Sequence, residues 1–418
     1  MSGSGVRRRP AAGELSKYWR LDPDVVFLNH GSFGACPSPV LDAQSRLRER
    51  LERGPVQFLL RDGLALLDAA REELASFIGA DPSELAFVPN ATTGVNTVLR
   101  SLRFERGDEL LTTNHEYNAC RNALDYVAER SGARVVVADV PFPVPSSASV
   151  VDAVLDRVTP RTRLALVDHV TSLTGMVMPI SGIVSALSEV GVDTLVDGAH
   201  APGMLPLDVR KLAPAYFTGN CHKWLCAPKG AALLYVRKDL QEGIRPLAIS
   251  HGANQPVEDR SRFRMEFDWT GTHDPTAYLC VPESIRFMGS LFEGGWPELM
   301  KRNRRLALDA RGLLCERLGV PPACPEEMVG TLASIPLEEG SYAFRTTALA
   351  FDPMDDILRE RYGIDVPVLS CPDGPGSILR IAAQAYNSIE QYEYLAFAIT
   401  EILAGKSPGE RARRDSSH

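Results

Sequence analysis

The sequence lacks several features that mark whole classes of protein. No run of apolar residues approaches the ~18 that a membrane-spanning helix requires. The formal net charge is −8, so no basic excess attracts nucleic acid or an anionic membrane surface. The basic segment Arg7-Arg8-Arg9 is not followed by the apolar stretch of a signal peptide. We therefore expect no nucleic acid and no membrane among the partners of this chain.

Paired cysteines are also missing. The eight cysteines contain no Cys-x-x-Cys spacing, and Cys221 and Cys226 stand five positions apart. Scattered cysteines in a chain of this size are typical of reduced thiols rather than of a disulfide framework or a metal site. Together with the lack of a signal peptide, this pattern predicts a cytoplasmic protein and no metal.

The composition is that of an ordinary globular protein, with 44% hydrophobic and 23% charged residues. A length of 418 residues predicts two or three domains. We expect a flexible arm over residues 1–22, a large domain over 23–281, a small domain over 282–404 and a disordered tail over 405–418. The first ~40 residues of the large domain are a segment that can instead pack with the small one.

Strand-like and helix-like patterns alternate through the predicted large domain. Apolar runs predict strands over residues 25–29, 85–88, 109–113, 134–140, 164–169, 194–197 and 231–236. Helical spacing lies between them, for example over 39–79, where Gly79 is placed as a C-cap. This alternation predicts an α/β fold with a mainly parallel sheet covered by helices on both faces. Residues 241–275 are expected to be loop-rich.

The pattern changes near residue 282. Long helical stretches are expected over 296–318, 354–362 and 389–403, with strands over 347–351 and 378–382. This mixture predicts a smaller α+β domain.

Polar clusters follow the predicted strand ends, which is where ligands bind in such folds. Asn90-Ala91-Thr92-Thr93-Gly94 opens a helix, so its backbone N–H groups and hydroxyls suit an anion, although an ordinary N-cap uses the same residues. His30-Gly31-Ser32-Phe33-Gly34 indicates backbone that passes close to a ligand or another subunit, or else a plain turn.

One pairing indicates a cofactor. Asp197 closes a buried strand, and Lys223 follows in Asn220-Cys221-His222-Lys223-Trp224. Pyridoxal phosphate (PLP) chemistry needs a lysine amine that forms a Schiff base with the aldehyde and a carboxylate that keeps the pyridine nitrogen protonated. The sequence therefore predicts that Lys223 carries PLP and that Asp197 tunes it.

With these residues in view, the chain resembles the class V aminotransferase-fold enzymes, which are fold-type I PLP proteins. It is most similar to the isopenicillin N epimerase-like branch, which also holds hercynylcysteine sulfoxide lyase-type and lincosamide-pathway cysteine-conjugate enzymes; cysteine desulfurases are more distant relatives. The resemblance runs from Phe27 to Tyr386. Its motifs are Asn29-His30-Gly31-Ser32, Asn90-Ala91-Thr92-Thr93-Gly94, His115-Glu116-Tyr117, Val196-Asp197-Gly198-Ala199-His200, His222-Lys223-Trp224, Thr270-Gly271-Thr272 and Leu379-Arg380-Ile381. It implies a large domain with a seven-stranded sheet and a smaller C-terminal domain.

The resemblance implies roles at the reacting centre. Lys223 would be the Schiff-base lysine and the base that removes the Cα proton, and Asp197 would pair with the pyridine nitrogen. His200 would lie near the hydroxyl side of the ring or near the substrate. Either His115 or Tyr117 would stack on the ring, and the motif fits both.

The resemblance also implies binding roles. Thr92 and Thr93 would hold the phosphate, helped by His222 and Asn220. Thr272 would reach the phosphate of the neighbouring subunit, which implies a homodimer.

On the substrate side, the resemblance places Arg380 on the α-carboxylate of an amino acid, with Asn29 beside the substrate. A guanidinium suits this task because it binds a carboxylate in a bidentate manner. Plainer interpretations exist: Arg380 can form a surface ion pair, and His200 and His222 can be hydrogen-bonded core histidines.

The cofactor does not decide the reaction, because a Cα carbanion has several fates. We favour a C–S β-lyase that acts on a cysteine S-conjugate, with secondary metabolism as its setting. Such an enzyme releases a thiol or sulfenate, pyruvate and ammonia, and it needs Lys223 as its one base. The alternative is an epimerase, which needs a second acid on the opposite face, from Tyr117, His115 or water.

Other reactions fit the sequence less well. Cys371 lacks the flanking His and Arg of the desulfurase loop, which disfavours a cysteine desulfurase. An aminotransferase and a non-catalytic PLP-fold binding protein are the remaining alternatives. The rest of the substrate site is expected from residues 29–36, 54–62 and 245–275.

Overall fold

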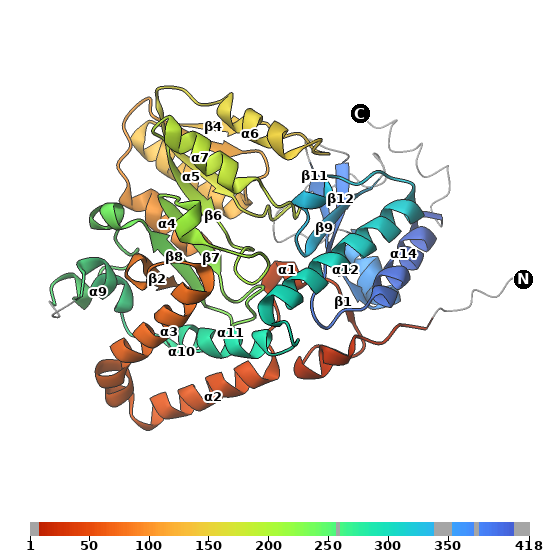
Figure 1. Cartoon of the computed structure of the whole chain (residues 1–418), viewed down its shortest axis with the longest axis horizontal. Helices are drawn as coiled ribbons and strands as arrows, with labels where there is room; N and C mark the ends of the chain where they lie inside the picture. The colour runs from red at the N-terminus through yellow and green to blue at the C-terminus, as the bar shows by residue number, and fades with distance from the viewer. Residues whose placement is uncertain (1–7, 256–259, 338–352, 372–375, 405–418) are drawn as a thin grey trace, which may run out of the picture.

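The computed structural model describes residues 8–255, 260–337, 353–371 and 376–404, with backbone only at 370, 371 and 376 (Figure 1). The strand predicted over 347–351 and the tail predicted over 405–418 lie outside these residues. None of the described helices combines the length and the apolar character needed to cross a membrane.

A seven-stranded sheet forms the centre of the large domain, in the order β2-β8-β7-β6-β5-β3-β4. Strand β8 runs antiparallel to both of its neighbours, and the other pairs are parallel. The strands are β2 (Leu85–Val88), β3 (Glu109–Thr113), β4 (Arg134–Ala138), β5 (Thr162–Asp168), β6 (Asp193–Asp197), β7 (Tyr216–Asn220) and β8 (Ala232–Val236). The predicted, mainly parallel sheet is confirmed.

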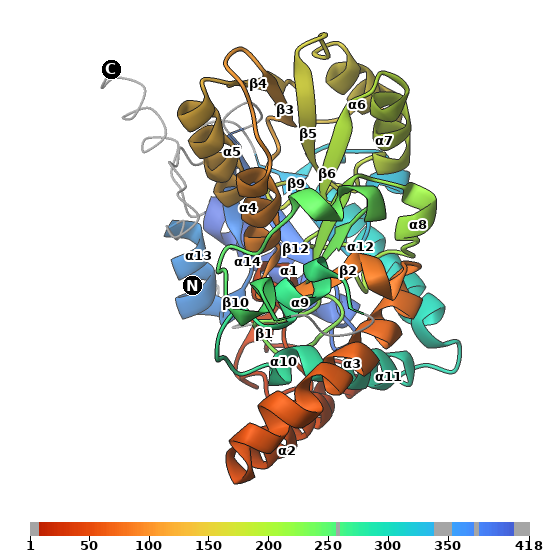
Figure 2. The same ribbon diagram turned by 90° about the vertical axis from the view of Figure 1, so that its left-hand side faces the viewer.

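Both faces of this sheet are buried. Along β5, Leu164 and Leu166 belong to one core and Ala165 and Val167 to the other, because successive side chains of a strand point to opposite faces. Figure 2 shows α4 and α5 on one side of the strands and α6 and α7 on the other. The covering helices are α3 (Gly63–Ile78), α4 (Ala91–Ser101), α5 (Asn118–Ser131), α6 (Ser147–Leu155) and α7 (Ile180–Glu189).

A small antiparallel sheet, in the order β11-β12-β9, packs on the long helix α12, which in turn packs on α14 (Figure 1). The elements of this part are α12 (Gly295–Leu318), β9 (Leu332–Pro336), α13 (Pro353–Ile357), η7 (Leu358–Tyr362), β10 (Ile364–Asp365), β11 (Val368–Cys371), β12 (Gly376–Ala382) and α14 (Ile389–Ala404). Near the start of the chain, β1 (Val26–Phe27) pairs in parallel with β10, so the N-terminal segment is bound to this part.

The helical pattern over residues 39–79 is divided in the structure. Helix α2 (Ser38–Arg53) ends at Gly54, and the π-helical η2 (Gln57–Asp62) precedes α3. Pro55 explains the break, since it has no N–H to continue α2. Gly79 is the left-handed C-cap of α3, with φ 66°, as predicted.

The remaining elements are short, and α9 interrupts the segment expected to be loop-rich. They are η1 (Glu14–Tyr18), α1 (His30–Phe33), η3 (Pro82–Glu84), α8 (Val209–Leu212), η4 (Lys238–Gly243), η5 (His251–Ala253), α9 (Arg262–Asp268), α10 (Thr276–Leu279), α11 (Val281–Gly289) and η6 (Glu326–Met328).

The segment expected to form a flexible arm, residues 1–22, packs against the protein over part of its length. The Gly13 N–H donates to the Tyr386 carbonyl at 2.8 Å, and the Trp19 ring meets the Tyr386 ring at 5.1 Å. Trp19 is buried. One buried aromatic ring therefore anchors a segment whose polar composition alone favours a loose arm.

Two helical glycines give a matched pair of substitutions. A Cβ added at Gly94 in α4 would lie 2.2 Å from Thr218 Oγ1 in β7, whereas one at Gly312 in α12 would meet no atom within 4 Å. Because Ala favours helix over Gly, Gly312→Ala is expected to raise the free energy of unfolding by roughly 0.5–1 kcal/mol. Gly94→Ala is expected to lower it by roughly 1–3 kcal/mol through overpacking. Calorimetric unfolding compares both with the wild type; equal stabilities would contradict the close packing of α4 on β7.

Candidate functional site

The segments predicted to form the site meet where β5, β6 and β7 end. Asp168 of β5 is level with Asp197 of β6, and Asp197 is level with Thr218 of β7. Lys223 follows β7 after a short connection. Because parallel strands end at the same edge of a sheet, the aspartate and lysine segments are brought together there.

Asp197 is buried and holds two hydrogen-bond donors. Its Oδ1 accepts the Ala199 N–H at 2.9 Å, and its Oδ2 accepts the Cys120 thiol at 3.1 Å. Burial raises the pKa of Asp197, while these two donors and the Lys223 charge act in the opposite direction. The two donors therefore stabilise the charged form of Asp197, and this buried carboxylate can bind a further cationic group.

Two more acids lie beside Asp197. Glu116 Oε2 accepts the Thr112 hydroxyl at 3.1 Å, while Glu116 Oε1 and Asp168 Oδ2 have no hydrogen-bond partner among the described residues. Burial raises the pKa of Glu116 and of Asp168, and the charge of Asp197 adds to both shifts. Because three neighbouring carboxyls do not all ionise, the strong upward shifts of the Glu116 and Asp168 pKa values favour the protonated form of these two, and Asp197, with two hydrogen-bond donors, is the best placed to carry the charge.

The Lys223 amine lies against an imidazole. Lys223 Nζ is 3.1 Å from His200 Nε2, and the indole N–H of Trp224 donates to His200 Nδ1 at 3.1 Å. Burial lowers the pKa of Lys223 to about 8, with Asp197 opposing the shift. Burial also lowers the pKa of His200 far below its usual value, and the charges of Lys223 and Arg380 add to this effect. At neutral pH, His200 is uncharged.

The backbone of the lysine segment is held by the N-terminal part of the chain. His30 Nε2 lies 3.0 Å from the Lys223 carbonyl, which only accepts, so His30 donates there and accepts the Tyr386 hydroxyl at Nδ1 (2.8 Å). A Cβ added at Gly34 would lie 2.1 Å from the His222 carbonyl. The close approach predicted for residues 30–34 is therefore to the lysine segment itself.

The start of α4 lies beside the same segment. Asn90 is the N-cap of α4, since its Oδ1 accepts the Thr93 N–H at 2.8 Å, and Asn220 Oδ1 accepts the Ala91 N–H at 2.9 Å. His222 donates from Nδ1 to the Ala231 carbonyl at 2.8 Å. The cap interpretation thus holds for Asn90, and Asn220 joins the end of β7 to the positive end of a helix dipole.

Arg380 of β12 is buried and makes no ion pair among the described residues, so the surface ion pair weighed from the sequence is wrong. Its Nη1 donates to the Ser172 carbonyl and its Nη2 to Ser32 Oγ (2.9 Å), while its Nε has no partner among these residues. The Ser32 hydroxyl in turn donates to Asn29 Oδ1 at 2.5 Å. Burial lowers the pKa of Arg380 to about 10, so it remains charged at neutral pH.

His115 and Tyr117 differ in what they leave available. His115 is buried, donates from Nε2 to the Val140 carbonyl at 3.1 Å and accepts the Thr174 hydroxyl at Nδ1 (3.1 Å). Tyr117 is 36% exposed. Burial raises the pKa of Tyr117, as do the charges of Cys120 and Asp197, while Arg380 lowers it. Tyr117 therefore lies within electrostatic reach of both the acidic and the basic side of the site.

Thr272 is not brought to this site by the described contacts. It is exposed in the segment after α9 and neighbours a separate pocket of about 430 Å³. The lining of that pocket includes Leu59, Leu60, Trp269, Gly271 and His273.

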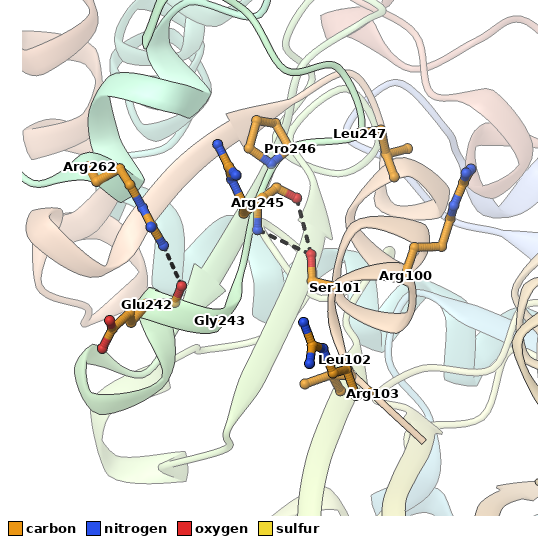
Figure 3. Close-up of a pocket in the computed structure, with 10 residues that line it drawn as sticks. All are labelled: Arg100, Ser101, Leu102, Arg103, Glu242, Gly243, Arg245, Pro246, Leu247 and Arg262. Carbon is orange, nitrogen blue, oxygen red and sulfur yellow. Dashed lines mark hydrogen bonds between the residues drawn. The ribbon is translucent and has the colours of Figure 1, made fainter. Parts of the chain in front are cut away.

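A further cavity of about 680 Å³ contains none of the residues to which the sequence assigned a role, although part of its lining falls in the range 245–275 that was expected to complete the substrate site (Figure 3). Its walls carry Arg100, Arg103, Arg245 and Arg262. Arg245 is already paired with Glu266 through two hydrogen bonds of 2.8 Å. Its charge is therefore largely neutralised.

Four further residues bear on the site without having been singled out from the sequence. Trp224 and Ser32 stand inside motifs quoted above, so their position was a usable signal. Cys120 lies in the first turn of α5, four residues after Glu116, and Asp168 closes β5 as Asp197 closes β6. The shared strand-end position of the two aspartates was the signal for Asp168.

His30 makes stability depend on pH. Burial lowers its pKa from 6.5 to about 3. Between these values the unfolded chain binds a proton that the folded chain does not, so the free energy of unfolding falls as the pH drops. His30→Gln, whose amide keeps one donor and one acceptor, is expected to remove up to one proton, or about 1.4 kcal/mol per pH unit, from this dependence. Urea unfolding between pH 7 and about 5 measures both slopes. Since the other buried histidines are common to both proteins, equal slopes would contradict a neutral buried His30.

The family model described as aminotransferase class-V matches residues 59–314, more than half of the chain. Isopenicillin N epimerase from Amycolatopsis lactamdurans is 36% identical over 396 residues, which cover 91% of this chain and 96% of the relative. A probable chloroplastic L-cysteine desulfhydrase from Arabidopsis thaliana is 31% identical over 419 residues, which cover 93% and 85%.

Among solved structures, the cystine C-S lyase C-DES in complex with cysteine persulfide superimposes with a TM-score of 0.74. The match covers 92% of this chain and 98% of that protein at 22% identity. At this identity the likeness shows a common fold.

Proposed function

We propose that this chain, which belongs to the class-V aminotransferase family, is a C–S β-lyase that acts on a cysteine S-conjugate. Family membership confirms the resemblance noted from the motifs, and it makes the chain a PLP-dependent enzyme that acts on amino acids. The substrate and the reaction are the proposed part.

The residues around Lys223 fit PLP. A lysine amine of lowered pKa, a buried Asp197 carboxylate and the start of α4 match the aldehyde, the pyridine nitrogen and the phosphate in chemical character. When bound, PLP supplies an electron sink for the bonds at the substrate Cα. We assign Lys223 and Asp197 to the first two groups, and propose that Tyr117, with its exposed ring, stacks on the cofactor rather than His115.

The phosphate is assigned to the start of α4. We propose that Thr92 and Thr93 hold it, with Asn220 fixing that helix end and His222 beside it. His200 is placed on the amine side of the site by its contact with Lys223.

Arg380 is the proposed site for the substrate α-carboxylate. Among the described residues this buried guanidinium contacts a carbonyl and a hydroxyl and no acid, so they do not supply the counter-charge that a buried cation requires. A carboxylate supplies this charge in a bidentate manner. Ser32 and Asn29 would keep the guanidinium in position, so Asn29 acts through Ser32 rather than alone.

The observation that favours the lyase is that, of Lys223, His200 and His115, only Lys223 is left to act as a base. The two imidazoles have no free lone pair, because His200 Nδ1 accepts from Trp224 and His115 Nδ1 accepts from Thr174. β-Elimination needs one base: Lys223 takes the Cα proton, the C–S bond breaks, and the thiolate leaves and takes a proton. Water then converts the enamine product to pyruvate and ammonia.

An epimerase is the second candidate, supported by the 36% identity to isopenicillin N epimerase and by Tyr117. Tyr117 carries a hydroxyl of raised pKa within electrostatic reach of Arg380, and in this second candidate it is the acid assigned to the face opposite Lys223.

A homodimer is part of the proposal. Thr272 is exposed, and so are Phe33, Val56 and Leu60, whose apolar side chains a second copy of the chain would cover. The cytoplasmic location is proposed from the seven described cysteines, all of which are free thiols.

The cofactor assignment is tested on the purified protein. We expect a yellow protein that borohydride bleaches, with the reduced pyridoxyl group attached to Lys223 in the peptide mass spectrum. Lys223→Ala is expected to lose the covalent label. A colourless protein after incubation with PLP would contradict the assignment. A label on Lys229 would show that Lys229, rather than Lys223, is the lysine that binds the cofactor.

The reaction is tested with L-cysteine S-conjugates in deuterated water. A lyase is expected to release pyruvate and thiol in equal amounts, whereas Cα deuteration of recovered substrate without pyruvate would overturn the lyase. Tyr117→Phe keeps the ring and removes the hydroxyl. It is expected to leave elimination within about tenfold of the wild type, whereas loss of a required acid costs ~100-fold or more.

Cys371 provides the control for a desulfurase. Cys371→Ala is expected to leave pyruvate release unchanged, since β-elimination needs no thiol nucleophile. Loss of turnover in this variant, with sulfide formed but no pyruvate in the wild type, would indicate a persulfide route instead.

A further inference from the structure

Lys223, His200 and Trp224 form a chain of two hydrogen bonds. Both distances are 3.1 Å, from Trp224 Nε1 to His200 Nδ1 and from His200 Nε2 to Lys223 Nζ. Trp224 and His200 are each 1% exposed, and Lys223 is half-buried. Water therefore has little access to either imidazole nitrogen.

The chemistry of the indole decides the direction of both bonds. An indole N–H donates and has no lone pair to accept with, so His200 Nδ1 must be the acceptor. A neutral imidazole carries its one proton on the other nitrogen, so His200 Nε2 carries an N–H that points at Lys223 Nζ. If Lys223 were an ammonium, the N–H of His200 Nε2 and an N–H of Lys223 would point at each other, and neither could accept. The amine must accept, and only a neutral amine has a lone pair.

We infer that Trp224 is a positioning residue: its indole N–H fixes the tautomer of His200, and His200 thereby holds Lys223 as a free amine. Sequence motifs gave Trp224 no role. The order of the hydrogen bonds stands on the described geometry alone, whereas the use of the free amine to capture a PLP aldehyde rests on the proposed function.

The charged groups around Lys223 act in both directions. Asp197 of β6 favours the ammonium, and Arg380 of β12 disfavours it. Asp168 of β5 and Cys120 of α5 act in the same direction as Asp197 only when they are ionised. Burial is the largest influence and favours the neutral amine, with a pKa of about 8. The N–H of His200 acts in the same direction as burial. Removal of that N–H leaves the other groups in place, so its effect on Lys223 can be measured separately.

A neutral amine is the form that attacks an aldehyde, so this arrangement favours cofactor capture near neutral pH. The same geometry defines His200 as a donor. It faces the reacting nitrogen with an N–H, and it cannot serve as a base while Trp224 occupies Nδ1.

The first test is the tautomer itself. In the cofactor-free full-length chain with ¹⁵N-labelled histidine, the long-range ¹H–¹⁵N spectrum should show His200 with a protonated Nε2 and an unprotonated Nδ1. His200→Gln identifies the signal. A wild-type His200 protonated at Nδ1 would overturn the inference without any variant of Trp224.

The second test is the reactivity of Lys223 against pH, because acetic anhydride modifies only neutral amines. Trp224→Phe keeps an aromatic ring and removes the N–H, so His200 can turn its lone pair toward Lys223. We expect the midpoint of Lys223 acylation to rise by roughly half to one pH unit, which is the size of one hydrogen bond. Exposed Lys301 serves as the internal reference in the mass spectrum.

His200→Gln is the matched control, since an amide accepts from Trp224 with its oxygen and donates to Lys223 with its nitrogen. Its midpoint should stay at the wild-type value. An unchanged midpoint in a folded Trp224→Phe protein would overturn the inference. Both tests use the cofactor-free chain, so a chain that fails to bind PLP would contradict the proposed function and leave these results standing.

Discussion

The attraction between the Lys223 amine and the buried Asp197 carboxylate is the interaction on which the site depends. Burial opposes both charges, lowering the pKa of Lys223 and raising that of Asp197, and each group moderates the shift of the other. Glu116 and Asp168 limit the negative charge by staying protonated beside Asp197. This balance leaves an amine with a pKa of about 8, well below its usual value, next to a carboxyl that carries the negative charge, the combination that imine chemistry on a pyridine cofactor requires.

The N-terminal segment and the small domain hold the same lysine from the other side. His30 bonds to the Lys223 carbonyl and to Tyr386, and the backbone at Gly34 passes against His222 with no room for a side chain. Arg380 comes from β12 of the small domain and reaches the large domain at the Ser172 carbonyl. The Lys223 amine and the proposed carboxylate site are thus built on two parts of the chain that share direct contacts, so a displacement of either part alters the distance between the two groups that are proposed to hold an amino-acid substrate.

The parts of this site that could be predicted from the sequence are those set by strand ends. Asp197 and Lys223 follow apolar runs, and the alternation of strands and helices places such ends at one edge of a parallel sheet. Cys120 was beyond reach, because it approaches Asp197 from α5 and nothing in its neighbourhood encodes that helix's rotation. The arm of residues 1–22 was misjudged at Trp19 for a similar reason: the partner, Tyr386, is distant in sequence. The role of Thr272 stays a prediction, because the described chain shows it exposed beside another pocket and the homodimer that would give it a partner is itself proposed.

The choice between elimination and epimerisation is made away from Lys223. Both reactions need a neutral amine, a tuned pyridine nitrogen and a bound carboxylate, so the contacts of Trp224, His200, Asp197 and Arg380 serve either one equally. The two reactions differ in the group that they need on the face opposite Lys223. Elimination needs room there for a leaving thiolate, and epimerisation needs a proton donor. Of Tyr117 and His115, Tyr117 is the one that we propose as the proton donor, since both nitrogens of His115 are engaged by Val140 and Thr174. Under the proposed assignment, the residue that stacks on the cofactor, rather than the lysine, therefore decides which of the two reactions follows.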